Sequence, residues 1–163
     1  MKKIFSSTLE YILQQAAKPA AVYLLFIWSF VEAWFIIPIP PDVILAPMVL
    51  AKPSKAFFYA NITTISSILG GCLGFIIGMF AIDYAMGIIN TLGLQGYYDQ
   101  ALEWFSVWGS AVILIAGFTI IPFKVFTIMA GAMKMNFFLF LIAATLSRGA
   151  RFYLVSYAAK IGG

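Results

Sequence analysis

Residues 20–51 decide the fold, and they read AAVYLLFIWSFVEAWFIIPIPPDVILAPMVLA. The first 18 of them are apolar except for two polar side chains, and a proline-rich break follows. The break contains Pro38, Pro40 and Pro41. Prolines remove backbone donors and force extended geometry, so no helix continues through them. The nine apolar residues 43–51 would extend about 14 Å as a helix, too short to cross a membrane. The stretch therefore predicts a re-entrant hairpin over 20–51, which enters and leaves the membrane on one side.

The composition excludes a water-soluble globule. Of 163 residues, 63% are hydrophobic and 10% charged, and the mean hydropathy is +1.00. Soluble domains have about 25% charged residues. The absence of histidine and the single Cys72 argue against imidazole chemistry, a disulfide and a multi-cysteine metal site. No nucleophile–base set is present either. We therefore expect no enzyme, no cofactor and no metal.

The remaining segments complete one all-α integral membrane domain over residues 1–163. The spacing predicts an amphipathic helix over 4–18, transmembrane helices over 56–82 and 137–159, an interfacial segment over 84–107 and a second re-entrant hairpin over 109–134, broken at Pro122. A frayed tail is the alternative for 4–18. One face of the first transmembrane helix carries small residues every four positions, which favour close helix packing. They are Ser66, Gly70, Gly74 and Gly78.

The segments form two copies of one unit: apolar arm, break, return arm and full span. A shift of 81 residues places Pro41 on Pro122, Met48 on Met129 and Ser67 on Arg148. Because a hairpin does not change side and each long helix does, the two hairpins should point at each other from opposite faces. This is an inverted repeat of the kind found in transporters.

The lysines fix an orientation for this repeat. Six lie on the side of the two ends of the chain and one, Lys134, on the other. The six are Lys2, Lys3, Lys18, Lys52, Lys55 and Lys160. The positive-inside rule makes their side cytoplasmic and explains the net charge of +4 without nucleic acid. In the alternative, residues 20–37 cross the membrane completely, which would place Lys52 and Lys55 on the opposite side and remove this asymmetry.

Five ionisable residues fall within or at the tips of the apolar segments. They are Glu32, Asp42, Lys124, Arg148 and Arg151. Each costs at least about 2.5–3.5 kcal/mol near the bilayer centre, so they need pairing or a water-filled cavity. Opposed hairpins bring the acids toward the bases and predict a midplane polar site with a surplus of one positive charge. The alternative is that the pairs only lock the fold, and Lys124 alone could reach the interface. We expect Asp42 to cap the return arm and Glu32 to exchange protons.

These motifs resemble the DedA family (SNARE-associated or VTT domain), and its YqaA-like branch in particular. The resemblance is carried by Glu32, the Pro38–Leu45 string, the glycine helix over 70–78, the segment 118–131 and the string 148–152. It implies a bacterial inner-membrane protein with two opposed re-entrant hairpins that moves phospholipid or polyprenyl phosphate between leaflets, in some members with the proton gradient. The family's hairpin acids correspond to Glu32 and Asp42.

Three classes of function stay open from the residues. A lipid translocase or scramblase-like protein would bind an anionic head group at the polar site, with membrane lipids and protons as its partners. A proton-coupled solute or ion transporter would use the same charges in a closed pocket, and a structural membrane protein would use them as fixed ion pairs. A second copy of the chain, in a homo-oligomer, is a further candidate partner.

Overall fold

The computed structural model describes residues 16, 18–35, 39–93, 95–118 and 123–162. These residues form helices with no strand among them, which confirms the all-α prediction. The elements are α2 (Ala20–Glu32), α3 (Asp42–Ala51), the short 3-10 helix η1 (Pro53–Lys55), α4 (Ala56–Thr91), α5 (Gln95–Phe118), α6 (Phe123–Ala132) and α7 (Phe137–Gly162). The amphipathic helix expected over 4–18 lies almost wholly outside the described residues.

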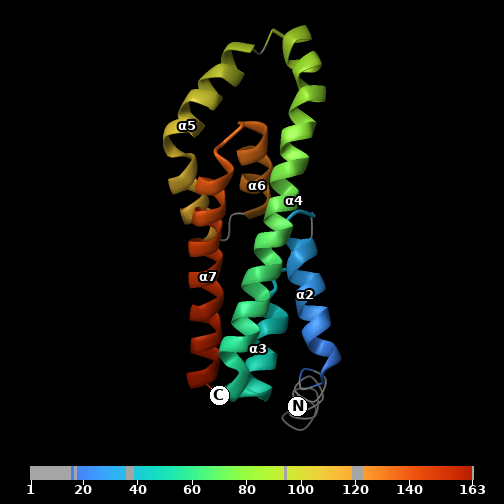
Figure 1. Cartoon of the computed structure of the whole chain (residues 1–163), viewed down its shortest axis with the longest axis vertical. Helices are drawn as coiled ribbons and strands as arrows, with labels where there is room; N and C mark the ends of the chain where they lie inside the picture. The colour runs from blue at the N-terminus through green and yellow to red at the C-terminus, as the bar shows by residue number, and fades with distance from the viewer. Residues whose placement is uncertain (1–15, 17, 36–38, 94, 119–122, 163) are drawn as a thin grey trace, which may run out of the picture.

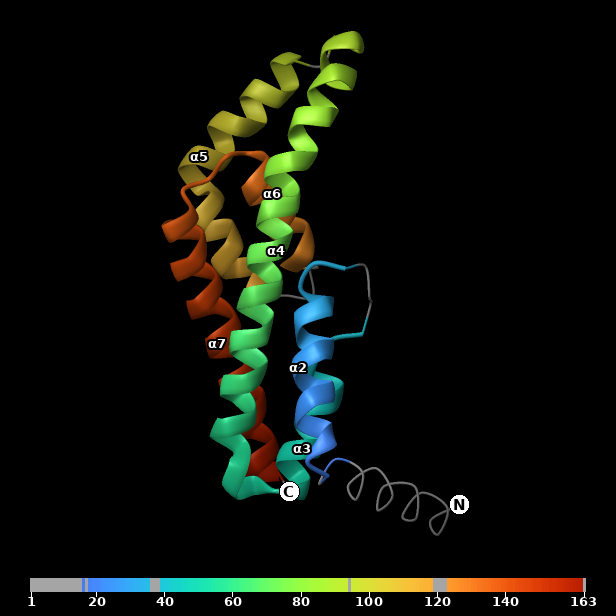
Figure 2. The same ribbon diagram turned by 45° about the vertical axis from the view of Figure 1, so that its right-hand side comes forward.

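Two long helices, α4 and α7, run side by side along the molecule (Figure 1). The pair α2 and α3 lies beside one half of them, and the pair α5 and α6 lies beside the other half, as Figure 2 also shows. Each pair runs toward the middle of the molecule and back. The start of α2 and the end of α7 therefore lie at the same end (Figure 1).

The two halves of the chain, residues 20–91 and 95–162, exchange the partners of their return arms. The first arms pack on the long helix of their own half, α2 on α4 and α5 on α7. The return arms pack chiefly on the long helix of the other half, α3 on α7 and α6 on α4. The halves are consequently interlocked.

Within the described residues, two segments are long and apolar enough to cross a membrane: Pro53–Thr91, which includes α4, and α7. At 1.5 Å per residue, the 36 residues of α4 extend about 54 Å and the 26 residues of α7 about 39 Å. The apolar helices α2, α3 and α6 have 13, 10 and 10 residues and are too short to cross. Length and composition thus agree with a membrane protein.

Three helix boundaries differ from the prediction. α4 continues past Asp83 to Thr91, since an exposed charge breaks no backbone hydrogen bond, and it ends before Gly93, whose φ of 67° is left-handed. α5 joins most of the expected interfacial segment to the first arm of the second hairpin, because no proline separates them. α2 stops at Glu32, five residues before Ile37, and a turn replaces the helix as Trp34 N donates to Val31 O at 3.3 Å.

Two apolar clusters fill the interior of the bundle. One lies between α2, α3, α4 and α7 and includes Leu25, Leu45 and Phe152. The other lies between α4, α5, α6 and α7 and includes Phe75 and Phe140, whose ring centroids are 4.9 Å apart. Along α7 the two clusters are separated by a polar layer centred on Arg148.

Candidate polar site at the centre of the bundle

Glu32 connects three helices in the polar layer. It is the last residue of α2, and its Oε2 accepts a hydrogen bond from Arg148 Nη2 of α7 at 3.1 Å. Its Oε1 lies 3.5 Å from Lys124 Nζ of α6. The three residues are 8%, 3% and 7% exposed, so the cluster is closed off from its surroundings. We call these three residues the central triad; it has two cations for one carboxylate.

Arg148 is held on every side. Its Nε donates to Ser67 Oγ of α4 at 2.7 Å. Its guanidinium carbon lies 4.7 Å from the ring centroids of both Phe123 and Phe152. Cation–π contacts of this kind are strongest when the cation is desolvated. The aromatic pair therefore offsets part of the cost of burying Arg148 and fixes the plane of its guanidinium.

Lys124 forms a hydrogen bond to a backbone carbonyl just beyond the end of α2. Its Nζ donates to Phe35 O at 2.9 Å, just beyond the last helical residue of α2. A carbonyl beyond a helix end has no intrahelical partner, so it can accept from a side chain. Lys124 is thus drawn inward rather than toward the membrane surface.

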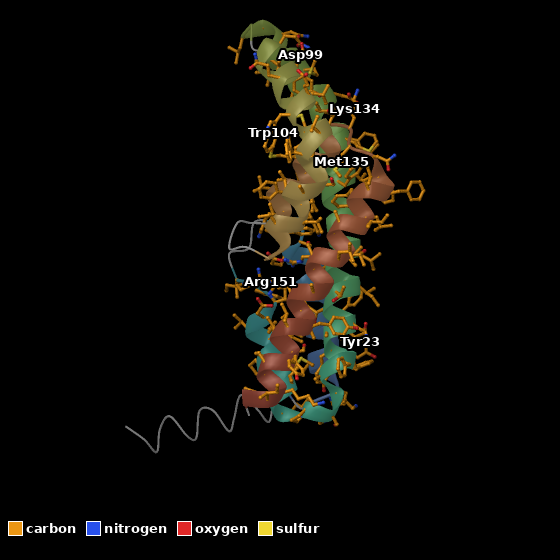
Figure 3. The ribbon with its side chains drawn as sticks, turned by 90° about the vertical axis from the view of Figure 1, so that its left-hand side faces the viewer. Tyr23, Asp99, Trp104, Lys134, Met135 and Arg151 are labelled. Carbon is orange, nitrogen blue, oxygen red and sulfur yellow. The ribbon has the colours of Figure 1, made fainter. Side chains whose placement is uncertain are left out.

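A second ion pair lies at the edge of the polar layer. Arg151 Nη2 donates to Asp42 Oδ2 at 2.6 Å, and the two side chains are 23% and 21% exposed. Figure 3 labels Arg151 near the middle of the molecule. The expected cap is wrong: α3 begins after Pro41 with no side-chain cap bond, because the carboxylate of Asp42 turns to Arg151 instead. Asp42 Oδ1 is buried without a hydrogen-bond partner.

Pro40 and Pro41, the prolines of the first break that lie within the described residues, start α3. Pro40 O accepts from Val43 N at 3.3 Å, and Pro41 O accepts from Ile44 N and Leu45 N at 2.9 Å each. Pro41 has a φ of −59°, a value that the proline ring favours and that suits the residue before a helix. Pro38 and Pro122 lie outside the described residues.

The small-residue stripe of α4 meets two helices rather than one. Any Cβ at Gly70 would strike Phe30 O of α2, and one at Gly78 would strike Ile128 O of α6. Gly74 faces Thr127 of α6. Ser66 is buried and donates to Ile62 O of its own helix at 2.8 Å. The stripe therefore sets the close approach of α2 and α6 that brings Glu32 and Lys124 together.

All five ionisable residues singled out in the sequence lie in this layer, and three further residues join them. Phe123, Phe152 and Ser67 were not expected to contact the charges. Ser67 had one signal, its register with Arg148 under the 81-residue shift, and the structure joins these two side chains directly. No group of three His, Cys, Asp or Glu side chains that could hold a metal ion occurs within the described ranges.

These features define the chain as a helical protein with two candidate membrane spans and a buried charged centre. It is 44% identical over 161 residues to an "Uncharacterized protein" of Haemophilus influenzae, a match that covers 99% of this chain and 83% of that protein. It is 42% identical to the "Uncharacterized protein HI0703 homolog" of Histophilus somni, covering 99% and 84%. The chain belongs to the family of these proteins. It matches no family model and no solved structure.

Proposed function

We propose that this protein moves a lipid with an anionic head group between membrane leaflets. The observation that carries the proposal is the central triad, in which Lys124 and Arg148 share the single carboxylate of Glu32 in a buried place. Because two desolvated cations share one carboxylate, the site favours the binding of a second anion. A phosphate group supplies one, and arginine binds phosphate through two parallel hydrogen bonds.

The packing supports an inverted repeat of two re-entrant hairpins. In such a repeat, each arm should find the same kind of partner in both halves, and the exchange of α3 and α6 between the long helices has this form. A contact between residues one repeat apart marks the axis that relates the halves. Ser67 and Arg148 are 81 residues apart and are hydrogen-bonded. The central triad would then lie at the membrane midplane.

The level of the triad within α7 supports this placement. Arg148 follows Phe137 by 11 residues and precedes Gly162 by 14, which correspond to about 17 Å and 21 Å of helix. Half a hydrocarbon core is about 15 Å. We propose a multi-pass protein of the bacterial inner membrane with both ends of this chain cytoplasmic, in agreement with its resemblance to the DedA family.

Cysteine labelling tests the orientation. In a Cys72→Ser background, Lys18→Cys and Ile161→Cys should react with an impermeant maleimide from the same face of inner-membrane vesicles. Labelling of the two positions from opposite faces would overturn the re-entrant hairpins.

The two ion pairs suggest an order of binding. Asp42 and Arg151 are each about one-fifth exposed, so Arg151 is the first cation that a head group would meet. The phosphate would then replace Glu32 as the partner of Arg148 and Lys124. Glu32, displaced from both cations, would take up a proton, because an unpaired carboxylate is costly in a buried place. In this scheme head-group and proton movements are coupled through one side chain.

A structural role is the second candidate. Both carboxylate oxygens of Glu32 face cations, and Arg148 is closed between two aromatic rings. An arrangement of this kind can hold α2, α6 and α7 together without any transport. The experiment below separates the two roles.

Reconstitution into liposomes tests the proposed function. Movement of fluorescent phosphatidylglycerol between leaflets, measured by dithionite quenching, should be faster with the protein than without it, and should respond to a pH gradient. Arg148→Ala and Arg151→Ala should each abolish the movement. Lys160→Ala, also on α7 but exposed and outside the polar layer, is the matched control and should keep it. Unchanged movement in a folded double Ala variant would leave only the structural role.

A further inference from the structure

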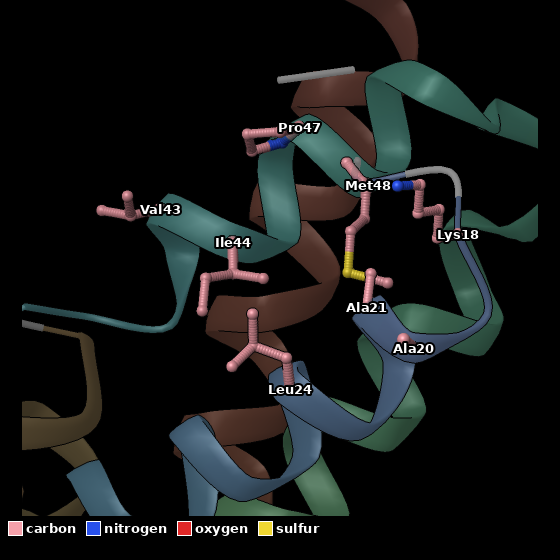
Figure 4. Close-up of a pocket in the computed structure, with 9 residues that line it drawn as sticks. Lys18, Ala20, Ala21, Leu24, Val43, Ile44, Pro47 and Met48 are labelled. Atoms are coloured by element: carbon pink, nitrogen blue, oxygen red, sulfur yellow. The ribbon is translucent and has the colours of Figure 1, made fainter. Parts of the chain in front are cut away.

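The two arms of the first hairpin leave an open groove between them. It has a volume of about 390 Å³ and lies between α2 and α3 (Figure 4). Leu24 of α2 and Ile44, Pro47 and Met48 of α3 line it, with Ala20 and Ala21 as the smallest wall residues. Figure 4 shows Ile44 and Met48 of α3 pointing toward Leu24 and Ala21 of α2 across the groove. Its volume is in the range of ligand sites.

The groove exists because the arms pack elsewhere. α2 packs on α4 and α3 on α7, so the two arms make few contacts with each other. The alanines of α2 leave space that larger side chains would fill. Met48, which is fully buried, forms the floor, while Leu24 and Val43 at the rim are 53% and 59% exposed. Such a trough can receive an occupant from the side without any rearrangement of the bundle.

The chemistry of the lining is apolar with one cationic end. Among the described residues of the lining, Lys18 is the one ionisable side chain, and it lies where α2 begins. Leu24 lies four residues after Ala20, or about 6 Å deeper along the helix. Lys55 and Lys160 are exposed at the same end of the molecule, where α4 begins and α7 ends. The groove thus offers an apolar trough below a cluster of positive charge.

The second hairpin does not repeat these features. The 81-residue shift places Asp99 at the position of Lys18, so the charge is reversed. It places Phe105, which is 2% exposed, at the position of Leu24. The large buried ring takes the place of a half-open leucine. The cationic trough is therefore a property of one half of the molecule and one side of the membrane.

We propose that the α2–α3 groove is a seat for one acyl chain of an anionic glycerophospholipid, with Lys18 on its phosphate. The proposal rests on the membrane placement given above but not on transport. A gap between helices in the hydrocarbon core loses contacts if it stays empty, and lipid tails are the material available to fill it. Basic residues at the membrane surface attract anionic lipids. A tail in the trough and a phosphate at its cationic end satisfy both conditions at once.

Native mass spectrometry of the full chain in detergent tests the seat. The protein is titrated with phosphatidylglycerol or with phosphatidylethanolamine of identical acyl chains. We expect one phosphatidylglycerol molecule to be retained more tightly than phosphatidylethanolamine. Lys18→Gln should weaken the binding of phosphatidylglycerol by roughly fivefold, the effect of one surface charge. Lys55→Gln, a lysine at the same end that is not among the described lining residues, should weaken the binding less than Lys18→Gln does.

A second variant pair tests the trough itself. Leu24→Trp should fill the groove and reduce the retention of both lipids. Leu154→Trp is the matched control, since Leu154 is 59% exposed on α7 and lies outside the groove lining. A photoactivatable phosphatidylglycerol should label peptides of α2 and α3. Equal retention by Leu24→Trp and Leu154→Trp, or labelling spread evenly over α4 and α7, would overturn the seat and indicate annular lipid only.

The result is separable from the proposed function. Lipid retained in the groove by a protein that moves no lipid in liposomes would support the seat and refute the translocase. Lipid movement by the Leu24→Trp variant at the wild-type rate, together with loss of the retained lipid, would support both. Loss of all lipid preference with intact movement would refute the seat alone.

Discussion

Replacement of Glu32 by glutamine is the most informative perturbation of this molecule. The change keeps the size of the side chain and removes the one carboxylate within 3.5 Å of both Lys124 and Arg148. Removing one partner of a buried ion pair costs about 3–5 kcal/mol, because the remaining charge stays buried. Here two cations would remain. We therefore expect Glu32→Gln to destabilise the folded state by about 3–5 kcal/mol.

The assay is thermal unfolding of the purified protein in detergent. For a chain of this size, 1 kcal/mol corresponds to a shift in Tm of about 2–4 °C, so the expected decrease is roughly 6–20 °C. Glu103→Gln, an exposed glutamate of α5, is the control and should shift Tm by less than about 2 °C. The double variant Glu32→Gln, Lys124→Met should recover part of the loss by removing one of the two buried cations. If Glu32→Gln unfolds at the temperature of Glu103→Gln, the central triad is not a buried ion-pair network.

Three further outcomes follow from the same structure. Asp42→Asn should lower Tm less than Glu32→Gln does, since the Asp42 pair is partly exposed and α3 needs no cap from it. Arg148→Lys should lose most of the lipid movement measured in liposomes, because lysine cannot keep both the serine and the carboxylate contacts in one planar group. Gly78→Leu should reduce the amount of folded protein recovered from membranes, since its side chain would strike the backbone of α6, whereas Gly87→Leu, with no atom near its Cβ, should not.

The sequence was sufficient for the order of the helices and for the five ionisable residues that meet in the polar layer. Proline breaks and apolar lengths depend on local chemistry, so the helical arms before and after Pro40 and Pro41 could be predicted. The pairing of the charges could not. Whether Arg148 meets Glu32 or Asp42 depends on the rotation of α7 about its axis, which is set by its packing on α3, α4 and α5.

The aromatic contacts of Arg148 show the same limit. Phenylalanine is common in this chain, with 16 copies, and nothing in the neighbourhood of Phe123 or Phe152 marks either as a partner for a cation. The predicted end of the first transmembrane helix at residue 82 is also wrong. Asp83 lies within α4, which extends about 54 Å and is thus longer than a hydrocarbon core requires.

The exchange of return arms between the two halves has a consequence for synthesis on the ribosome. α3 packs chiefly on α7, yet its last residue, Ala51, precedes Phe137 by 86 residues. At about 5–20 residues per second, the partner of α3 is made roughly 4–17 s later. During that interval, α3 lacks the surface on which it chiefly packs in the finished structure. The packing of α3 is thus completed only after α7 has been translated.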